Sequence, residues 1–511
     1  MRKHVEKIAR FLSSVPSMLF ALTLIAVLIV LFMSNSFSFA YKTLSQTSYI
    51  TASLFAFVLF SLLLLWCKYG SKKEVKWYVI VGYFAIVLIA QFVIAKSIWY
   101  YPGWDVESCY ATAEAIARGE IFDQSYFQSC PNNAPITLLL SIPLAIAIKL
   151  GLAVPYAVLP YCGAIVQNLS CYIAVLCVQR ALKNGTITYI TMLLSSLWIA
   201  FSGYMTIPYT DVYGLLFAIL AIYLWLLNFR PFVKWLLIGL VCMFGASIKP
   251  SIIIILVAMV ILGVLKLIKD ASTGEKVFKK ALTISLALFI GIVPGNIWKN
   301  ASTAYVAGSA TPQNQLSETH YIMMGQNPHS YGGHSPDDVA FTMSFDTLLE
   351  KREANISVAL ERIRDRSFAE NINFYSIKLL KAYAEGNFAF TNSMLILEEP
   401  KRDDNLSHAL RSVYRTKGEN FNVAMLFYQV IWLMILFACL LACIIKRKQP
   451  FVQLLSLCLF GLTFYLMLVE VWPRYLYVFS LLYLVLAMFG LDSLSQRFVT
   501  TSQRMNSQAN S

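Results

Sequence analysis

The stretch YPGWDVESCYATAEAIARGEIFDQSYFQSCPNNA, residues 101–134, is polar, acidic and aromatic, and it lies between two apolar segments. One apolar segment ends at Tyr100 and the next begins at Pro135. Apolar segments long enough to cross a bilayer place their ends at its surfaces, so we expect residues 101–134 to form a loop at a membrane surface. The spacing of apolar residues within 107–119 predicts a short amphipathic helix along that surface.

The composition of the whole chain is typical of a membrane protein. Of the 511 residues, 58% are hydrophobic and 13% are charged, and the mean hydropathy is +0.64. A soluble domain is closer to half apolar and a quarter charged. The apolar runs are continuous rather than alternating, so we expect an all-α polytopic protein with about 12–13 transmembrane helices.

The positive charge is concentrated in short loops, which indicates orientation rather than nucleic-acid binding. Basic clusters occur in 68–76, 230–234, 266–280 and 446–448. The segment 301–420 instead holds 12 Lys and Arg against 15 Asp and Glu, a balance of −3. The positive-inside bias therefore predicts a plasma-membrane protein with both termini in the cytoplasm and with 101–134 and 301–420 outside.

These features divide the chain into parts. The expected parts are two additional N-terminal spans (1–76), a transmembrane core with the first outer loop (77–300), a large outer loop domain (301–420), C-terminal spans (421–494) and a cytoplasmic tail (495–511). Apolar spacing predicts helices over about 338–366 and 369–384 in the large loop.

The segment 135–152 is expected not to cross the membrane completely. It is short, contains Pro143 and ends at Lys149. If it crossed, Arg180 and Lys183 would lie outside, against the charge bias. A re-entrant or tilted half-span resolves the conflict.

Asp105 is the first candidate for chemistry, because a carboxylate beside Trp104 at a lipid surface is partly desolvated and suits a general base. Helix capping explains the same residue equally well. Glu107 has the same two interpretations. Asp211, at the end of a span, is either a second carboxylate of this site or a helix cap.

Two cations on the expected outer side point to an anionic ligand. Lys249, in SIKP, and Arg474, in VWPRYLY, contradict the positive-inside bias, and each would contact either a phosphate or lipid headgroups. Snorkelling explains Lys249 without a ligand, and Glu470 is an alternative partner for Arg474.

The remaining polar groups give weaker indications. Asn132 and Asn133 form a turn at a span entrance, and their amides could also contact sugar hydroxyls. Cys109 and Cys130 share the loop, so a disulfide and two free thiols both remain open. The histidines of the large loop are a weak metal pattern, so no metal is expected, and no nucleotide-binding glycine loop occurs.

Together these motifs resemble the GT-C glycosyltransferases, most of all the protein O-mannosyltransferase and lipid A aminoarabinose transferase type. The resemblance covers about residues 77–300 and the segment 470–475, and MGQNPHSYGGHSPDD (324–338) is similar to loops of Gram-positive members. It implies a GT-C-like bundle whose extracytoplasmic loops carry short helices. It places Asp105 at the catalytic centre, although Val106 stands where the family often has a second acid.

The resemblance further implies catalytic roles for Glu107 and Asp211. It implies contact of the donor phosphate with Lys249, Arg474 and Tyr475, and contact of sugar or acceptor with Trp104, Asn132 and Asn133.

The function so implied is inverting transfer of a sugar from a polyprenyl monophosphate to a hydroxyl of a cell-surface glycan, lipid or protein, without an obligatory cofactor. A transporter or flippase of lipid-linked saccharides, and a polymerase or ligase using a diphosphate donor, are the alternatives.

Overall fold

The computed structural model describes residues 14–33, 46–272, 277–308 and 312–509. Within these ranges ten helices are long and apolar enough to cross a membrane. They are α2 (Val15–Met33), α3 (Gln46–Tyr69), α4 (Trp77–Ile98), α7 (Ala134–Lys149), α8 (Leu159–Leu182), α11 (Pro231–Ile248), α12 (Ile253–Ser272), α13 (Val277–Ala307), α19 (Phe421–Ile445) and α20 (Pro450–Leu468). Two shorter apolar helices are α9 (Gly185–Ser195), which continues as a π-helical turn over Ser196–Ala200, and α10 (Thr210–Leu226). The predicted all-α membrane fold is confirmed, with ten candidate spans among the described residues where about 12–13 were predicted.

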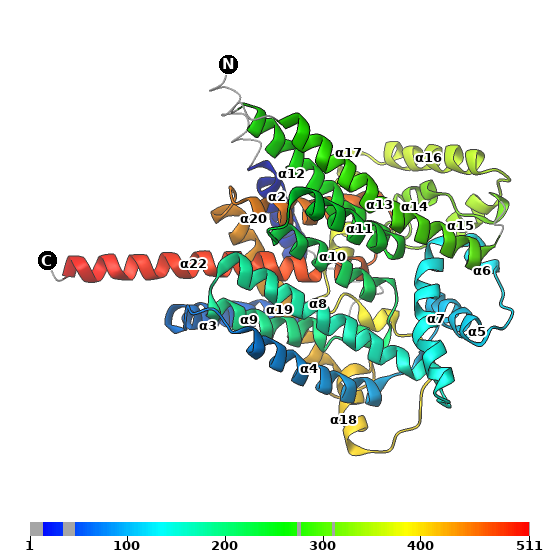
Figure 1. Ribbon diagram of the computed structural model, residues 1–511, viewed down its shortest axis with the longest axis horizontal. Coiled ribbons are helices and arrows are strands. Elements are labelled where there is room, and N and C mark those ends of the chain that lie inside the picture. Colours follow the sequence, from blue (N-terminus) through cyan, green and yellow to red (C-terminus); the bar gives the residue numbers. More distant parts are fainter. Residues whose placement is uncertain (1–13, 34–45, 273–276, 309–311, 510–511) are drawn as a thin grey trace.

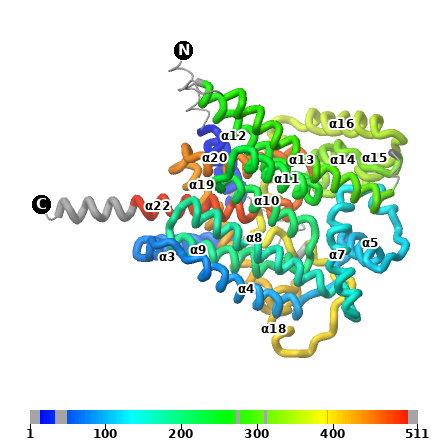
Figure 2. Tube along the Cα trace, viewed as in Figure 1, coloured from blue at the N-terminus to red at the C-terminus, as the bar shows by residue number. Residues whose placement is uncertain are grey.

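The first part of the C-terminal helix α22 (Ser480–Ala509) lies inside the bundle (Figure 1). The side chains of its residues 480–491 are almost completely buried. Gly490, which has no side chain, lies against the backbone of α19. Helix α22 packs most closely on α19, and the two N-terminal helices α2 and α3 pack on α19, α20 and α22. The tube in Figure 2 shows the same arrangement, in which the first and last parts of the chain share one half of the bundle.

Helix α7 does not run alongside the other long helices. Its first turn lies beside α5 (Trp104–Arg118), and the chain that follows it packs Tyr156 on Trp99 and Tyr101, at the end of α4. Both ends of α7 are therefore at the same end of the bundle, and Figure 1 shows α7 running across the ends of α4 and α8. Helix α7 is nevertheless long and apolar enough to be a membrane span, so the incomplete crossing of this segment stays a prediction.

The charged loops separate to the two ends of the bundle. At one end, the loop 70–76 contacts residues 183–186, and Asn184 donates a hydrogen bond to Asp492. Arg180 and Lys234 donate to the last carbonyls of α10 there. We call this the basic end. The opposite end, which we call the loop end, carries α5 and the helices between residues 318 and 414.

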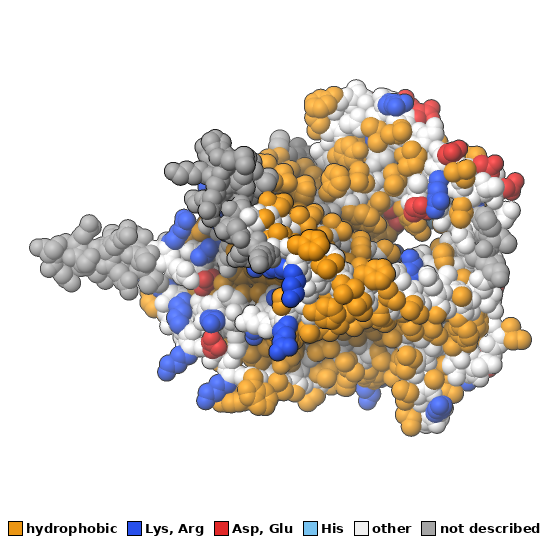
Figure 3. Space-filling model, turned by 45° about the horizontal axis from the view of Figure 1, so that its top comes forward, with side chains coloured by type: hydrophobic (Ala, Val, Ile, Leu, Met, Phe, Trp, Pro, Cys, Tyr) orange, Lys and Arg blue, Asp and Glu red, His pale blue; other side chains and the backbone are white. Residues whose placement is uncertain are grey.

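The surface between the two ends is apolar. Large hydrophobic side chains of α3, α4, α12 and α13 are exposed, among them Phe57 (69%), Ile86 (70%) and Phe289 (69%). Figure 3 shows hydrophobic side chains over the middle of the molecule. Such a surface is stable only against lipid, so the chain is an integral membrane protein.

The segment at the loop end contains five helices, α14 (Glu318–Gly325), α15 (Pro336–Met343), α16 (Leu348–Asp365), α17 (Phe368–Tyr383) and α18 (Asn405–Tyr414). The helix predicted over 338–366 is in fact two helices. Thr347 and Glu350 form a capping box, which starts a new helix at Leu348. Ser367 and Glu370 form a second capping box, which starts α17 close to the predicted position.

A two-residue strand, β1 (Tyr101–Pro102), pairs antiparallel with β2 (Ile396–Glu398). Gly103 extends this contact by donating its N–H to the Leu395 carbonyl at 2.8 Å. A side chain at Gly103 would collide with Leu395. The first predicted outer loop is thereby held against the end of the large one.

Candidate functional site

The backbone at the start of α5 is strained at Trp104. Gly103 is the N-cap, and Trp104 follows with φ of 52°, which is rare for a bulky side chain. The indole Nε1 donates to the Ser393 carbonyl at 2.9 Å, and the ring meets Tyr209 edge-on with the centroids 5.4 Å apart. A strained residue of this kind persists only where its surroundings hold it, and such residues are frequent at functional sites.

Asp105 is the second residue of α5 and not its cap, so the capping interpretation does not hold. Its carboxylate is half-buried and forms no hydrogen bond or ion pair with another described residue. The neighbours on which its charge acts include Tyr126, Cys130 and Arg474. Asp105 therefore lies in the site as a carboxylate without a protein partner.

Asp211 and Lys249 form a buried ion pair. Asp211 is in the first turn of α10, whose N-cap is Tyr209, so Asp211 is not the cap either. Its Oδ1 lies 2.5 Å from Lys249 Nζ, and the two side chains are 5% and 13% exposed. Pro250 explains the position of Lys249, because the residue before a proline is forced out of helical geometry, and Lys249 ends α11 with φ −133° and ψ 101°.

Tyr475 carries the Lys249 ammonium on its ring, with 4.6 Å between Nζ and the ring centroid. The Tyr475 hydroxyl donates to Glu470 at 2.8 Å, and the Trp472 indole donates to the other oxygen of Glu470 at 2.7 Å. Glu470 thus pairs with these two rings and not with Arg474, which was the alternative partner considered from the sequence. The sequence analysis did not predict that Glu470 positions Tyr475, although Glu470, Trp472 and Tyr475 lie close together in EVWPRY.

Arg474 is a cation without an anionic partner among the residues that the structure describes. Its guanidinium lies over the Trp104 ring, 4.5 Å from the centroid, and its Nε is buried without a hydrogen bond. Burial alone would lower the pKa of Arg474. The negative charges nearby, among them Asp211 and Asp105, outweigh this effect and raise the pKa above its usual value, so the guanidinium stays charged. A buried, charged donor with unused hydrogen-bonding capacity is suited to an anionic ligand.

The other predicted site residues are only partly brought to this cluster. Asn133 is buried and donates to the Tyr126 hydroxyl at 2.6 Å, so it orients a ring beside Asp105. Asn132 is exposed and contacts Asn133. Glu107 is exposed on the opposite face of α5, and its charge acts on Tyr101. The structure therefore separates Glu107 from Asp105.

Cys109 and Cys130 are both free thiols. Burial, and then the Asp105 charge, raise the pKa of Cys130 to about 12. Burial also raises the pKa of Cys109, so both thiols are protonated at neutral pH.

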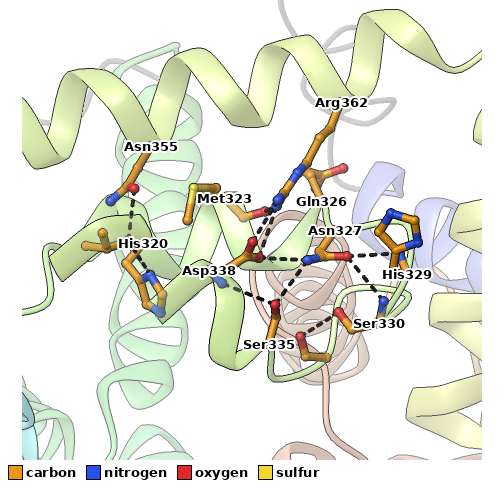
Figure 4. Close-up of polar contacts among 12 residues, drawn as sticks. His320, Met323, Gln326, Asn327, His329, Ser330, Ser335, Asp338, Asn355 and Arg362 are labelled. Carbon is orange, nitrogen blue, oxygen red and sulfur yellow. Dashed lines mark hydrogen bonds and ion pairs between the residues drawn. The ribbon is translucent and has the colours of Figure 1, made fainter. Parts of the chain in front are cut away.

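The histidine-rich part of the large loop forms a structural network, shown in Figure 4. Asp338 accepts two hydrogen bonds from Arg362, the shorter at 2.7 Å, and one from Asn327 at 3.0 Å. His320 contacts Thr342 at 2.7 Å. Among the described residues no group of three His, Cys, Asp or Glu side chains could hold a metal ion.

Taken together, Trp104, Asp105, Asp211, Lys249 and Arg474 converge at the loop end from four separate parts of the chain. The cluster contains an ion pair beside aromatic rings, together with a carboxylate and a guanidinium that have no ionic partner in the described part of the chain. Such an arrangement can take a proton at Asp105 and can hold an anion beside Arg474.

A model of the family described as "Conserved hypothetical integral membrane protein" matches residues 5–494. The chain belongs to this family. Neither the curated proteins nor the solved structures contain a significant match to the chain. The family therefore confirms an integral membrane protein, and the activity has to be argued from the site.

Proposed function

We propose that the chain is a membrane glycosyltransferase that uses a polyprenyl-monophosphate sugar as its donor. The observation that carries the proposal is a pair of groups without ionic partners among the described residues, the Arg474 guanidinium over the Trp104 ring and the Asp105 carboxylate next to Trp104 in the chain. The resemblance of the same positions to GT-C enzymes supports it.

The orientation follows from the charge distribution. The basic end carries the Lys- and Arg-rich loops, so the positive-inside bias assigns it to the cytoplasm. The candidate site, at the loop end, then faces the outside of the plasma membrane. No nucleotide-linked sugar is needed there, because the lipid itself presents the donor.

In the proposed reaction an acceptor hydroxyl attacks the anomeric carbon of the donor sugar. A new C–O bond forms as the bond from the anomeric carbon to the phosphate oxygen breaks, with inversion of configuration. The hydroxyl proton passes to Asp105, and the phosphate leaves as an anion beside Arg474 and the Lys249–Asp211 pair. Fixed positive charge where negative charge develops lowers the barrier, so no metal or cofactor is required by this scheme.

The transporter alternative has less support, because polar side chains inside the bundle are used for packing. Asn168 donates to Gln91 at 2.9 Å, and Gln91 donates to the Ala200 carbonyl at 2.7 Å. The Tyr383 hydroxyl forms hydrogen bonds with the hydroxyls of Thr463 and Tyr483. These groups satisfy one another and do not form a polar path across the bundle.

The test is ligand-induced thermal stabilisation of the purified protein by a polyprenyl monophosphate, with the polyprenyl alcohol for comparison. We expect the phosphate, and not the alcohol, to stabilise the protein. Arg474→Gln should weaken phosphate binding about tenfold or more, because it removes a charge-assisted hydrogen bond. Arg352→Gln, at an exposed pair with Glu318, is the matched control.

Equal binding of phosphate and alcohol, or wild-type binding by Arg474→Gln, would contradict the proposal. Tighter binding of a polyprenyl diphosphate than of the monophosphate would favour the polymerase or ligase alternative.

A further inference from the structure

Helix α5 has a second exposed face, opposite to the one that carries Asp105. Residues 107, 111, 114 and 118 follow a helical spacing of three and four, so they share one side of the helix. On this side Glu107, Ala111 and Arg118 are exposed, while Cys109 and Ala113 on the other side are buried. The face that carries Glu107 is free for a ligand.

An open groove of about 400 Å³ lies over this face. Its lining combines small, aromatic and charged side chains, which are Tyr101, Ala111, Glu114, Ala115, Arg118, Glu120, Tyr156 and Glu398. They come from α5 and the loop that follows it, from the β1–β2 pair and from the turn before α8. Ala111 and Ala115 supply small side chains, so the groove depends on the absence of bulk at these positions.

The two tyrosine rings of the groove are fixed in place. Tyr101 and Tyr156 meet edge to face with their centroids 4.8 Å apart. Tyr101 is backed by Tyr110 at 6.1 Å, and Tyr156 by Trp99 at 5.5 Å. Rings held in this way offer preorganised π surfaces to a bound group at little cost in entropy.

The groove carries an excess of negative charge. Three carboxylates line it against one guanidinium, that of Arg118, which gives 1 − 3 = −2. Arg118 is already paired with Glu114 at 2.6 Å, whereas Glu120 forms no ion pair with any residue that the structure describes. Burial, followed by the charges of Glu107 and Glu114, raises the pKa of Tyr101 to about 12, which reflects the same negative potential.

We propose that this groove binds the ammonium group of a ligand at the loop end of the protein. Aromatic faces and surplus carboxylates are the two features that attract a cation, through the ring quadrupole and through direct charge. An uncharged polyol would gain hydrogen bonds to the carboxylates but nothing from the net charge. The proposal stands independently of the transfer reaction, since the two sites lie on opposite faces of α5.

The experiment is saturation-transfer NMR on the full chain in detergent micelles, with tetramethylammonium as the cationic probe and glucose as the uncharged one. Empty micelles give the background. We expect transfer to tetramethylammonium, falling at least twofold in about 0.5 M salt because the charges are screened. Glucose should give no transfer.

Two variants test the location of binding. Ala111→Leu fills the groove from an exposed position, and Glu398→Gln removes one charge at nearly constant shape, so each should lower the transfer several-fold. Glu353→Gln, at an exposed position on α16, should leave it unchanged. Equal transfer in wild type and in both groove variants would overturn the proposal. Transfer to glucose and not to tetramethylammonium would overturn the assigned ligand class.

Discussion

Replacing Lys249 by methionine removes one partner of a buried ion pair and leaves the other charged. The Asp211 side chain is 5% exposed and lies 2.5 Å from the Lys249 ammonium. Breaking a buried pair from one side costs about 3–5 kcal/mol, because the remaining charge is desolvated and uncompensated. We therefore expect Lys249→Met to lower the free energy of unfolding by about this amount.

The double variant Lys249→Met/Asp211→Asn should recover most of the loss, since no buried charge remains, and the coupling energy should be about 3 kcal/mol. The assay is equilibrium unfolding in mixed micelles, followed by circular dichroism. Lys280→Met is the matched control, because Lys280 and Asp270 are also 2.5 Å apart but are 35% and 15% exposed. It should cost about 1 kcal/mol or less.

Equal losses for Lys249→Met and Lys280→Met would refute this reasoning. Lys249 would then be a cation that reaches the headgroups and stabilises little, as snorkelling predicts.

Three further predictions concern other parts of the chain. Burial lowers the pKa of His320 to about 4, so the unfolded chain binds a proton between pH 6.5 and 4 that the folded chain does not. Stability should fall by about 3 kcal/mol as the pH drops through this range, and His320→Asn should remove that dependence in pH-jump unfolding. Lys378→Met should cost roughly 3 kcal/mol in the same unfolding assay, because the Lys378 ammonium donates to three carbonyls, those of Gly325, Met467 and Val469, which would lose their partner. Gly291→Ala should lower the melting temperature, because the added Cβ would lie 2.4 Å from a carbonyl oxygen of α11, whereas Gly82→Ala, with open space around it, should be tolerated.

Much of the fold could be predicted, because hydropathy and loop charge report directly on membrane spans. The incomplete crossing of 135–152, predicted from Pro143, the short length and the charge balance of the next loop, stays a prediction, because α7 is apolar enough to span. The break between α15 and α16 was missed, since the capping box at Thr347 was not weighed against the apolar spacing that continues across it.

The convergence of Asp105, Asp211, Lys249 and Arg474 could be predicted only as four span ends at one surface. Their pairing depends on tertiary structure. The separation of Glu107 from Asp105 was within reach, because two residues along a helix are about 200° apart. Predicting this separation would have required Gly103, and not Asp105, to be taken as the N-cap of α5.

The conformation of Trp104 could not have been predicted. Its positive φ is maintained by the Ser393 carbonyl, far away in the chain, and no local pattern reports such a contact.

The most direct test of the proposed chemistry is sugar transfer in membranes that contain equal amounts of wild-type protein or of Asp105→Asn. The substitution preserves shape and removes the only group assigned to accept the proton. The account predicts that transfer falls by at least 100-fold, the lower limit of general-base catalysis, while the lipid-linked sugar accumulates and the melting temperature is unchanged. Wild-type transfer by Asp105→Asn would contradict it.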